Sequence, residues 1–382
     1  MTTLAEYCAF LNEQGRSGVP AQEIVASGLG DRRALIAAHP EWRTLGLVDG
    51  LLAAAQLELD RDALSALELT ELAIEISDDV RVPLPYQFLV TRTRGNAWKE
   101  HANALFRLTR LDDALHAVER ALGILAMEPV LAVERANATL VLALVRRGQG
   151  DLDTAGRLVR ESLEIFGTHV QPRGYLNAVQ TEALISFDRG DVLTARDIYR
   201  AALELAERID DERECARMLN NLGYCALLLH EFEAAANYLH RAFLGFTRNQ
   251  MAGELLRAVR NAALLAKENG HLEEALSLLH GTYARFLDRG MVTEAAVVNL
   301  EIGDVVMELT GDSDYAQELC RTLEVTLGRY DVPRNVRSAI NYLAMAAPQA
   351  GSTRRLREII AEVVKFLWQA VASPSAEFSP AA

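Results

Sequence analysis

Residues 271–283 read HLEEALSLLHGTY, and this stretch recurs in altered form four times earlier in the chain. The earlier copies are RLDDALHAVERAL at 110–122, DLDTAGRLVRESL at 151–163, DVLTARDIYRAAL at 191–203 and EFEAAANYLHRAF at 231–243. The fifth residue of every copy is alanine, and one later alanine continues the column: Ala114, Ala155, Ala195, Ala235, Ala275 and Ala316. The spacings are 41, 40, 40, 40 and 41 residues, so the chain is built from repeats.

Each repeat is predicted to be a pair of helices joined by a tight turn. A second column of small residues precedes the alanines: Ala102, Ala143, Ala183, Gly223, Ala263 and Gly303. Turn glycines stand between the two columns in four copies: Gly150, Gly190, Gly270 and Gly311. After the turn, apolar residues recur with helical spacing, as in Leu272, Ala275, Leu276 and Leu279. No proline occurs from Arg173 to Val332, which favours continuous helices.

Short segments within the repeats share a pattern of tryptophan, leucine, glycine and alanine. Residues 42–46 (WRTLG) and 219–223 (LNNLG) carry the W-x2-L-G opening, the second with leucine for tryptophan. Another copy is marked by Trp98, Ala102, Ala114, Val118 and Ala121. On these residues, and over about residues 87–328, the chain resembles the tetratricopeptide repeat (TPR) family. The period of 40 residues exceeds the family's usual length of about 34, so the resemblance is to its long-repeat branch.

This resemblance implies a fold and a mode of binding. The implied fold is all-α, a right-handed α-α superhelix (a TPR-like solenoid) of about seven antiparallel helix pairs. In the family, the first helix of each pair lines the inner face of the superhelix and holds extended peptides or partner helices. The chain also partly resembles bacterial TPR peptide receptors.

Four segments are expected along the chain. Residues 1–38 form a short N-terminal helical segment, and residues 39–328 form the TPR-like repeat array. Residues 329–372 form a helix pair that caps the apolar end of the array, because terminal repeats need a polar outer face. Residues 373–382 are small, polar and proline-containing, so we expect a disordered tail.

Composition and charge exclude several classes of protein. The net charge of −14 repels phosphate backbones and anionic headgroups, so we expect no nucleic-acid partner and no membrane partner. The longest apolar runs, such as residues 140–145, fall far short of the roughly 18 residues that span a bilayer. The four cysteines show no CxxC spacing, which favours reduced thiols and a cytoplasmic location.

No pattern typical of catalysis is present. The sequence lacks the phosphate-binding GxxxxGK[ST] loop, the zinc-binding HExxH, the nucleophile elbow GxSxG and a dinucleotide-binding glycine fingerprint. His230, His240, His271 and His280 are spaced unsuitably for a compact metal site. We therefore expect no enzymatic activity, no cofactor and no metal site.

The candidate site consists of polar residues that recur on the first helices. Asparagine repeats in phase at Asn177 and its counterparts Asn96 and Asn137, and again at Asn221 and Asn261. Because asparagine disfavours helix interiors, its repetition there needs a reason, and its amide suits a peptide backbone. Arginines in phase suit a carboxylate. The predicted partner-binding residues are Asn177, Arg217, Asn220, Asn221, Tyr224, Arg257, Arg260, Asn261, Lys99 and Asn103.

The same residues also suit purely structural roles. Asn221 and Asn261 suit an inter-repeat hydrogen bond equally well, and Asn177 suits a backbone contact near a turn. Arg217, Arg257 and Arg260 could simply neutralise the nearby Glu214 and Glu254 on a solvated face. Within the TPR family, Lys99 and Asn103 fit the first repeat of the carboxylate-clamp subgroup, but Val141 departs from its second.

The sequence thus favours a non-enzymatic scaffold or adaptor that binds a protein segment or peptide in the groove of a TPR superhelix. The alternative is a peptide-responsive bacterial regulator whose groove switches a partner protein. Residues 1–38 are short and carry few basic residues, which argues against a complete DNA-reading module.

Overall fold

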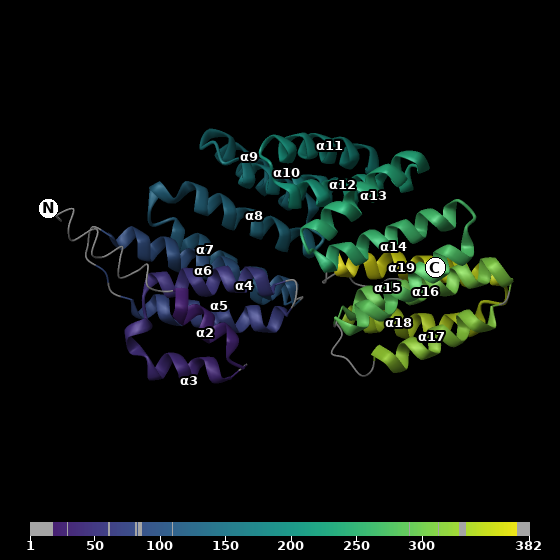
Figure 1. Ribbon diagram of the computed structural model, residues 1–382, viewed down its shortest axis with the longest axis horizontal. Helices are drawn as coiled ribbons and strands as arrows, with labels where there is room; N and C mark the ends of the chain where they lie inside the picture. The colour runs from purple at the N-terminus through teal and green to yellow at the C-terminus, as the bar shows by residue number, and fades with distance from the viewer. Residues whose placement is uncertain are drawn as a thin grey trace. The chain divides into compact units, whose positions relative to one another are not determined.

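The structure is a computed structural model that describes residues 18–28, 30–59, 62–80, 82, 86–108, 110–289, 291–311, 313–327 and 334–372. The tail predicted at 373–382, and residues 1–17 and 29 of the N-terminal segment, lie outside the described residues. Every regular element in the described part is a helix (Figure 1). None of the described helices is both long enough and apolar enough to cross a membrane.

The helices follow one another as pairs, and the predicted all-α, TPR-like solenoid is confirmed. Ahead of the array lie α2 (Gly18–Ala26) and α3 (Asp31–Ala38). The pairs are α4 (Leu45–Glu58) with α5 (Ala63–Asp79), α6 (Gln87–Arg107) with α7 (Leu111–Leu125), α8 (Ala132–Gly148) with α9 (Leu152–Thr168), α10 (Pro172–Asp188) with α11 (Val192–Arg208), α12 (Glu212–Leu228) with α13 (Phe232–Arg248), α14 (Ala252–Glu268) with α15 (Leu272–Asp288), and α16 (Val292–Thr310) with α17 (Asp314–Leu327). The last helices are α18 (Arg334–Ala346) and α19 (Thr353–Ala372).

From α9 to α15 the helices are equal in length, and a new one begins every 20 residues. Each of these helices has 17 residues. A residue with positive φ stands in each turn: Gly150, Val170, Gly190, Asp210, His230, Gln250 and Gly270. The backbone N–H of the residue that follows donates to a carbonyl near the end of the preceding helix, as from Gln171 to Phe166 at 2.9 Å. Turns within repeats and between repeats therefore share one geometry, whether or not glycine is present.

The chain divides into two compact units. Unit 1 comprises residues 1–146 and 153–175, and unit 2 comprises residues 147–152 and 176–382. In both units the small-residue columns lie in the core, with Ala102 and Ala114 buried in unit 1 and Ala263 and Ala275 buried in unit 2. Small side chains let consecutive helices approach closely, as the sequence predicts.

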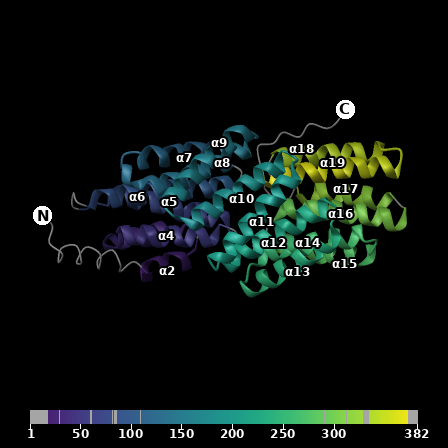
Figure 2. The same ribbon diagram turned by 90° about the horizontal axis from the view of Figure 1, so that it is seen from above.

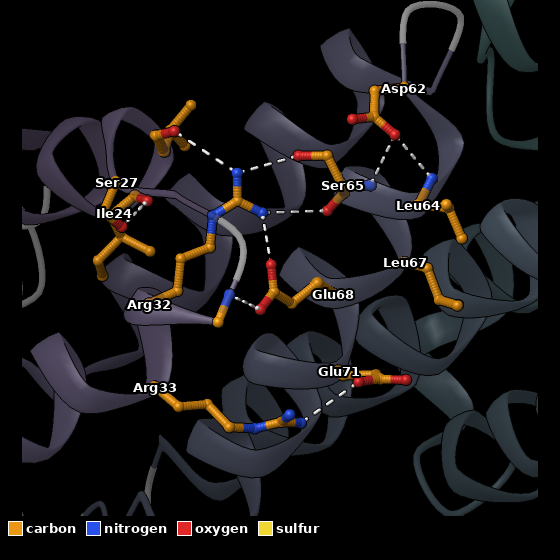
Figure 3. A network of polar contacts seen from close by, with 12 residues as sticks. Ile24, Ser27, Arg32, Arg33, Asp62, Leu64, Ser65, Leu67, Glu68 and Glu71 are labelled. Carbon is orange, nitrogen blue, oxygen red and sulfur yellow. Dashed lines mark hydrogen bonds and ion pairs between the residues drawn. The ribbon is translucent and has the colours of Figure 1, made fainter. Parts of the chain in front are cut away.

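In unit 1, the N-terminal helices are fixed to the first pair by a polar network (Figure 3). The buried guanidinium of Arg32 on α3 donates to Glu68 Oε2 at 3.0 Å and to Ser65 Oγ at 3.0 Å, both on α5. Beside it, Arg33 donates to Glu71 at 3.3 Å. The described part of the segment 1–38 is thus docked on the repeat array through charged side chains.

In unit 2, the C-terminal pair packs on the last repeat. Leu356, Ile360, Val363 and Leu367 form a buried stripe on α19, and this stripe shares a core with Val297 and Leu300 of α16. Figures 1 and 2 both show α18 and α19 beside α16 and α17. The second helix of the C-terminal pair therefore covers one face of α16.

Candidate functional site

Eight of the ten predicted site residues lie on three first helices of unit 2. Asn177 is on α10, and the others are on α12 and α14. We call the eight the Asn/Arg face: Asn177, Arg217, Asn220, Asn221, Tyr224, Arg257, Arg260 and Asn261. Asn177 is exposed, whereas Arg260 and Asn261 are only 4% and 5% exposed, and the other five are half-buried. The face therefore has a buried layer, formed by Arg260 and Asn261, and an accessible layer, formed by the other six residues.

The buried layer is centred on an ion pair between consecutive first helices. The Arg260 Nε of α14 lies 3.1 Å from Oε1 and 3.0 Å from Oε2 of Glu301 on α16, and its Nη2 also contacts this carboxylate. Burial alone lowers the pKa of the guanidinium, but the Glu301 charge outweighs it, so the pKa of Arg260 stays above its ordinary value. Arg260 is thus a permanent cation whose charge is neutralised inside the protein.

Tyr224 lies above this pair. The Arg260 Cζ stands 5.8 Å from the centre of the Tyr224 ring, within the range of a cation–π contact. The Tyr224 ring also lies 5.7 Å from the ring of Phe187 on α10. Tyr224 is therefore held between two repeats and remains half-buried.

Asn261 takes part in the contact between α12 and α14. Its Nδ2 donates to Asn220 Oδ1 at 3.2 Å, and its Oδ1 accepts from Arg260 Nη1 at 3.2 Å. Of the two interpretations of this asparagine, the inter-repeat hydrogen bond is the one that the structure contains. A direct contact of Asn261 or Arg260 with a partner stays a prediction. Because both side chains are buried, their burial favours a role in supporting the neighbouring residues of the face.

Arg217 and Arg257 form equivalent bridges to the next first helix. Arg217 donates to Glu254 at 3.0 Å, and Arg257, 40 residues later, donates to Glu294 at 3.1 Å. Arg217 also contacts Glu214 of its own helix. Burial lowers the pKa of Arg217, but Glu214 and Glu254 together raise it above its ordinary value. Both arginines already hold carboxylates of the protein, so they are not poised for a ligand carboxylate.

The face ends at α14, because α19 covers the corresponding part of α16. Val297 and Leu300, at the positions of Arg257 and Arg260, are buried in the core with α19. Asp304, at the position of Leu264, accepts from Arg357 Nε of α19 at 2.6 Å and contacts Lys267 of α14. Burial raises the pKa of Asp304, but Arg357 and Lys267 bring it below its ordinary value.

Lys99 and Asn103 lie in unit 1, on α6, and form a separate cluster. Both contact the buried Glu100, with Lys99 Nζ 2.6 Å from Oε1 and Asn103 Nδ2 2.8 Å from Oε2. Gln56 of α4 donates to the same carboxylate at 2.6 Å. Burial raises the pKa of Glu100, but Lys99 and the two amides bring it below its ordinary value. These two predicted site residues are therefore occupied with a buried carboxylate of the protein.

Sequence reasoning missed the acidic partners on the following helix. Glu294 and Glu301 complete the bridges of Arg257 and Arg260, yet neither was a candidate residue. A signal was present, since Glu214, Glu254 and Glu294 recur every 40 residues, in step with the arginines.

The described residues show no grouping of three or more His, Cys, Asp or Glu side chains that could hold a metal ion. Burial also holds the described thiols in their protonated form, because it raises the pKa of Cys215 to about 11 and those of Cys225 and Cys320 to about 12.

Comparison with solved structures identifies the architecture. The Rap conjugation gene regulator of the plasmid pLS20, in complex with the Phr* peptide, has a TM-score of 0.60 at 14% identity, covering 80% of each chain. Aspartyl phosphate phosphatase F from Bacillus subtilis has a TM-score of 0.56 at 12% identity, covering 78% of this chain and 75% of that one. A Rap protein complexed with competence and sporulation factor has a TM-score of 0.53 at 14% identity, covering 86% and 97%.

A comparison with models of known protein families finds no match, and a comparison with curated proteins finds no similar sequence. At 12–14% identity the structural likeness shows the fold alone. The fold of this chain is that of the TPR-like repeat proteins.

Proposed function

We propose that this protein is a non-enzymatic, cytoplasmic adaptor or regulator that binds a peptide, or an extended segment of a partner protein, on the Asn/Arg face of unit 2. The observation that carries this proposal is the two-layered construction of the face. The buried Arg260, paired with Glu301, contacts Tyr224 and the buried Asn261, while Asn177 is exposed and Asn221 is half-buried.

The polar character of the accessible layer favours recognition of a peptide backbone. An asparagine amide offers two donors and an acceptor, which matches the alternating groups of an extended chain. Because Arg217 and Arg257 are neutralised by glutamates, the layer carries little unpaired charge. We infer that the ligand is held mainly through its main chain, with the apolar edge of Tyr224 contacting one of its side chains.

Two of the similar structures support a peptide ligand, since they are complexes with a Phr* peptide and with competence and sporulation factor. The first of them is named as a gene regulator, which favours the regulatory form of the proposal over a passive scaffold. Another is named as a phosphatase, and the proposal assigns this chain no such activity.

The test is a thermal-shift screen of the full chain against a library of short peptides, followed by calorimetry with the peptides that stabilise it. We expect Asn177→Ala and Asn221→Ala each to weaken binding roughly fivefold, since a lost hydrogen bond is worth about 1 kcal/mol. Asn237→Ala is the matched control, because Asn237 is an exposed asparagine on α13. Equal affinities for all three variants would contradict the proposed face.

The same screen separates a regulator from a scaffold. A regulator should be stabilised by a small peptide alone, whereas a scaffold should respond only to its folded protein partner.

A further inference from the structure

A cavity of about 460 Å³ in unit 1 is formed by α6 and the two second helices that pack against it, α5 and α7. Figures 1 and 2 show these three helices side by side. The volume is within the range of small-molecule sites in proteins. The wall includes the indole of Trp98, the imidazoles of His101 and His116, and the guanidinium groups of Arg110 and Arg120. It therefore offers aromatic surface and cations in a chain whose net charge is −14.

The aromatic part of this wall is particular to its repeat. A cavity of about 380 Å³ stands at the equivalent place between α13 and α15, where Val259 and Ala262 occupy the positions of Trp98 and His101. None of the five later repeats has an aromatic side chain at either position. Packing between helices thus does not require an indole beside an imidazole here, and their presence favours a role in binding.

Arg120 is the arginine of the wall that has no acidic partner. Its Cζ stands 5.8 Å from the centre of the Trp98 ring, a cation–π distance, and it forms no ion pair or hydrogen bond with the described residues. The other arginine and the two carboxylates of the wall are already paired. Arg110 Nε donates to Asp113 Oδ2 at 2.8 Å, and Glu71 accepts from an arginine of α3 (Figure 3). A stacked guanidinium keeps its N–H edge available, and this edge matches a carboxylate in fork geometry.

His101 supplies a hydrogen-bond acceptor beside the same indole. Its ring centre lies 5.9 Å from that of Trp98, edge to face. Its Nδ1 lies 3.0 Å from Thr70 Oγ1, whose own proton is donated to the carbonyl of Leu67 at 2.7 Å, so Nδ1 carries the ring proton. Burial lowers the pKa of His101, which keeps the ring neutral and Nε2 unprotonated at neutral pH. Nε2 forms no hydrogen bond with the described residues, so it can accept one from a ligand.

The chemistry of the wall defines its ligand. A single unpaired arginine suits one negative charge, and the carboxylates of Glu71 and Asp113 in the same wall disfavour a doubly charged phosphate. Apolar contact is offered by Trp98, Leu105 and Ala117. The free acceptor suits a hydroxyl or N–H group on the ligand.

We propose that the cavity between α5, α6 and α7 binds a small monocarboxylic acid whose apolar body carries one hydrogen-bond donor. Arg120 holds the carboxylate, and His101 accepts the hydrogen bond. This site lies in unit 1 and does not depend on the peptide function proposed for the Asn/Arg face of unit 2.

The test is fluorine NMR of the full chain labelled with fluorotryptophan, because the sequence has only three tryptophans and Trp98→Phe identifies the resonance of the cavity. The probe is p-hydroxyphenylpropionate, a monocarboxylate with a phenyl body and one hydroxyl donor. The Trp98 resonance should shift to saturation, while that of Trp42, outside the cavity, stays unchanged. The neutral amide of the same acid should bind at least roughly tenfold more weakly, because it cannot form the charge-assisted pair with Arg120.

Arg120→Gln is the first variant, because Arg120 is exposed and its replacement should leave the fold intact. The dissociation constant of the probe should rise at least roughly tenfold, with little change for the amide. Arg160→Gln is the matched control, since Arg160 is an exposed arginine of α9 in the same unit and does not line the cavity. Ala117→Leu introduces the residue that α9, α15 and α17 carry at this position, so it should fill the cavity and weaken both acid and amide.

A Trp98 resonance that does not move at millimolar probe overturns the proposal. So does a dissociation constant that Arg120→Gln leaves unchanged. Inorganic phosphate that binds as tightly as the probe would reveal a general anion site. A peptide ending in tyrosine that binds more tightly than the probe would assign the carboxylate to a peptide C-terminus, and either of these results overturns the assignment to a small acid.

Discussion

Arg260 of α14 and Glu301 of α16 form a buried ion pair that joins two consecutive repeats at the floor of the candidate site. Breaking such a pair leaves one charge without its partner in the protein interior. We expect Glu301→Leu to destabilise unit 2 by about 3–5 kcal/mol. Hydrogen–deuterium exchange of α14 and α16 is the measurement.

The double variant Arg260→Met with Glu301→Leu serves as the control for this prediction. Removing both charges avoids the uncompensated charge, so the loss should be smaller than in Glu301→Leu alone. If the double variant were as unstable as the single one, the loss would come from packing and not from charge.

Asn221 and Asn261 are expected to respond differently, although they occupy the same repeat phase. Asn261→Ala removes hydrogen bonds to Asn220 and Arg260, so it should cost about 1–2 kcal/mol of folding stability. Asn221→Ala should change stability by no more than about 0.5 kcal/mol and act on ligand affinity instead. Chemical denaturation of both variants tests this, and equal losses of stability would refute the two-layered description.

Asp304 should make the docking of α19 sensitive to acid. Its pKa in the folded protein lies below the ordinary value of 3.8, so its stabilisation is present well above pH 3.8 and is lost as the pH falls through the folded pKa. Asp304→Asn should cost about 1–2 kcal/mol at neutral pH. In thermal melts this deficit should shrink as the pH is lowered below 3.8, and a deficit independent of pH would contradict the assignment.

Val170 is expected to be a point of backbone strain. Its φ is 51°, a left-handed conformation that β-branched residues disfavour, and its side chain is 81% exposed. Val170→Gly should therefore stabilise unit 1 by about 1 kcal/mol, since no contact is lost. Val170→Ala keeps a Cβ and should gain much less. Thermal unfolding of the two variants decides, and a destabilised glycine variant would show that the strain is absent.

The fold could be predicted from the sequence because its determinants are local and repeated. Ala195, Ala235 and Ala275 recur every 40 residues, which is also the interval between successive second helices. A close helix crossing tolerates little besides small residues at these positions. The turns were only half predicted, because Val170, Asp210 and Gln250 adopt positive φ without the glycine that usually marks it. At these turns the packing of the flanking helices fixes the backbone path, and the residue adopts a positive φ whatever its type.

The candidate site was harder to predict, because its geometry depends on distances between helices. The sequence places Arg257 and Asn261 on one face, but only the packing shows that Glu294 and Asn220 are within reach of them. The sequence places α18 and α19 at the end of the array, but it does not show which face of α16 receives α19, since an amphipathic helix fits many apolar faces. The change to Val297, at the position that Asn177, Arg217 and Arg257 hold in earlier repeats, was a local sign that α16 is covered.

The central claim is that ligands bind on the Asn/Arg face of the first helices in unit 2. Hydrogen–deuterium exchange of the full chain, with and without a peptide that raises its melting temperature, tests this most directly. We predict slower exchange in α10, α12 and α14 on peptide addition, with α11, α13 and α15 little changed. Protection confined to α11, α13 and α15 would contradict the claim.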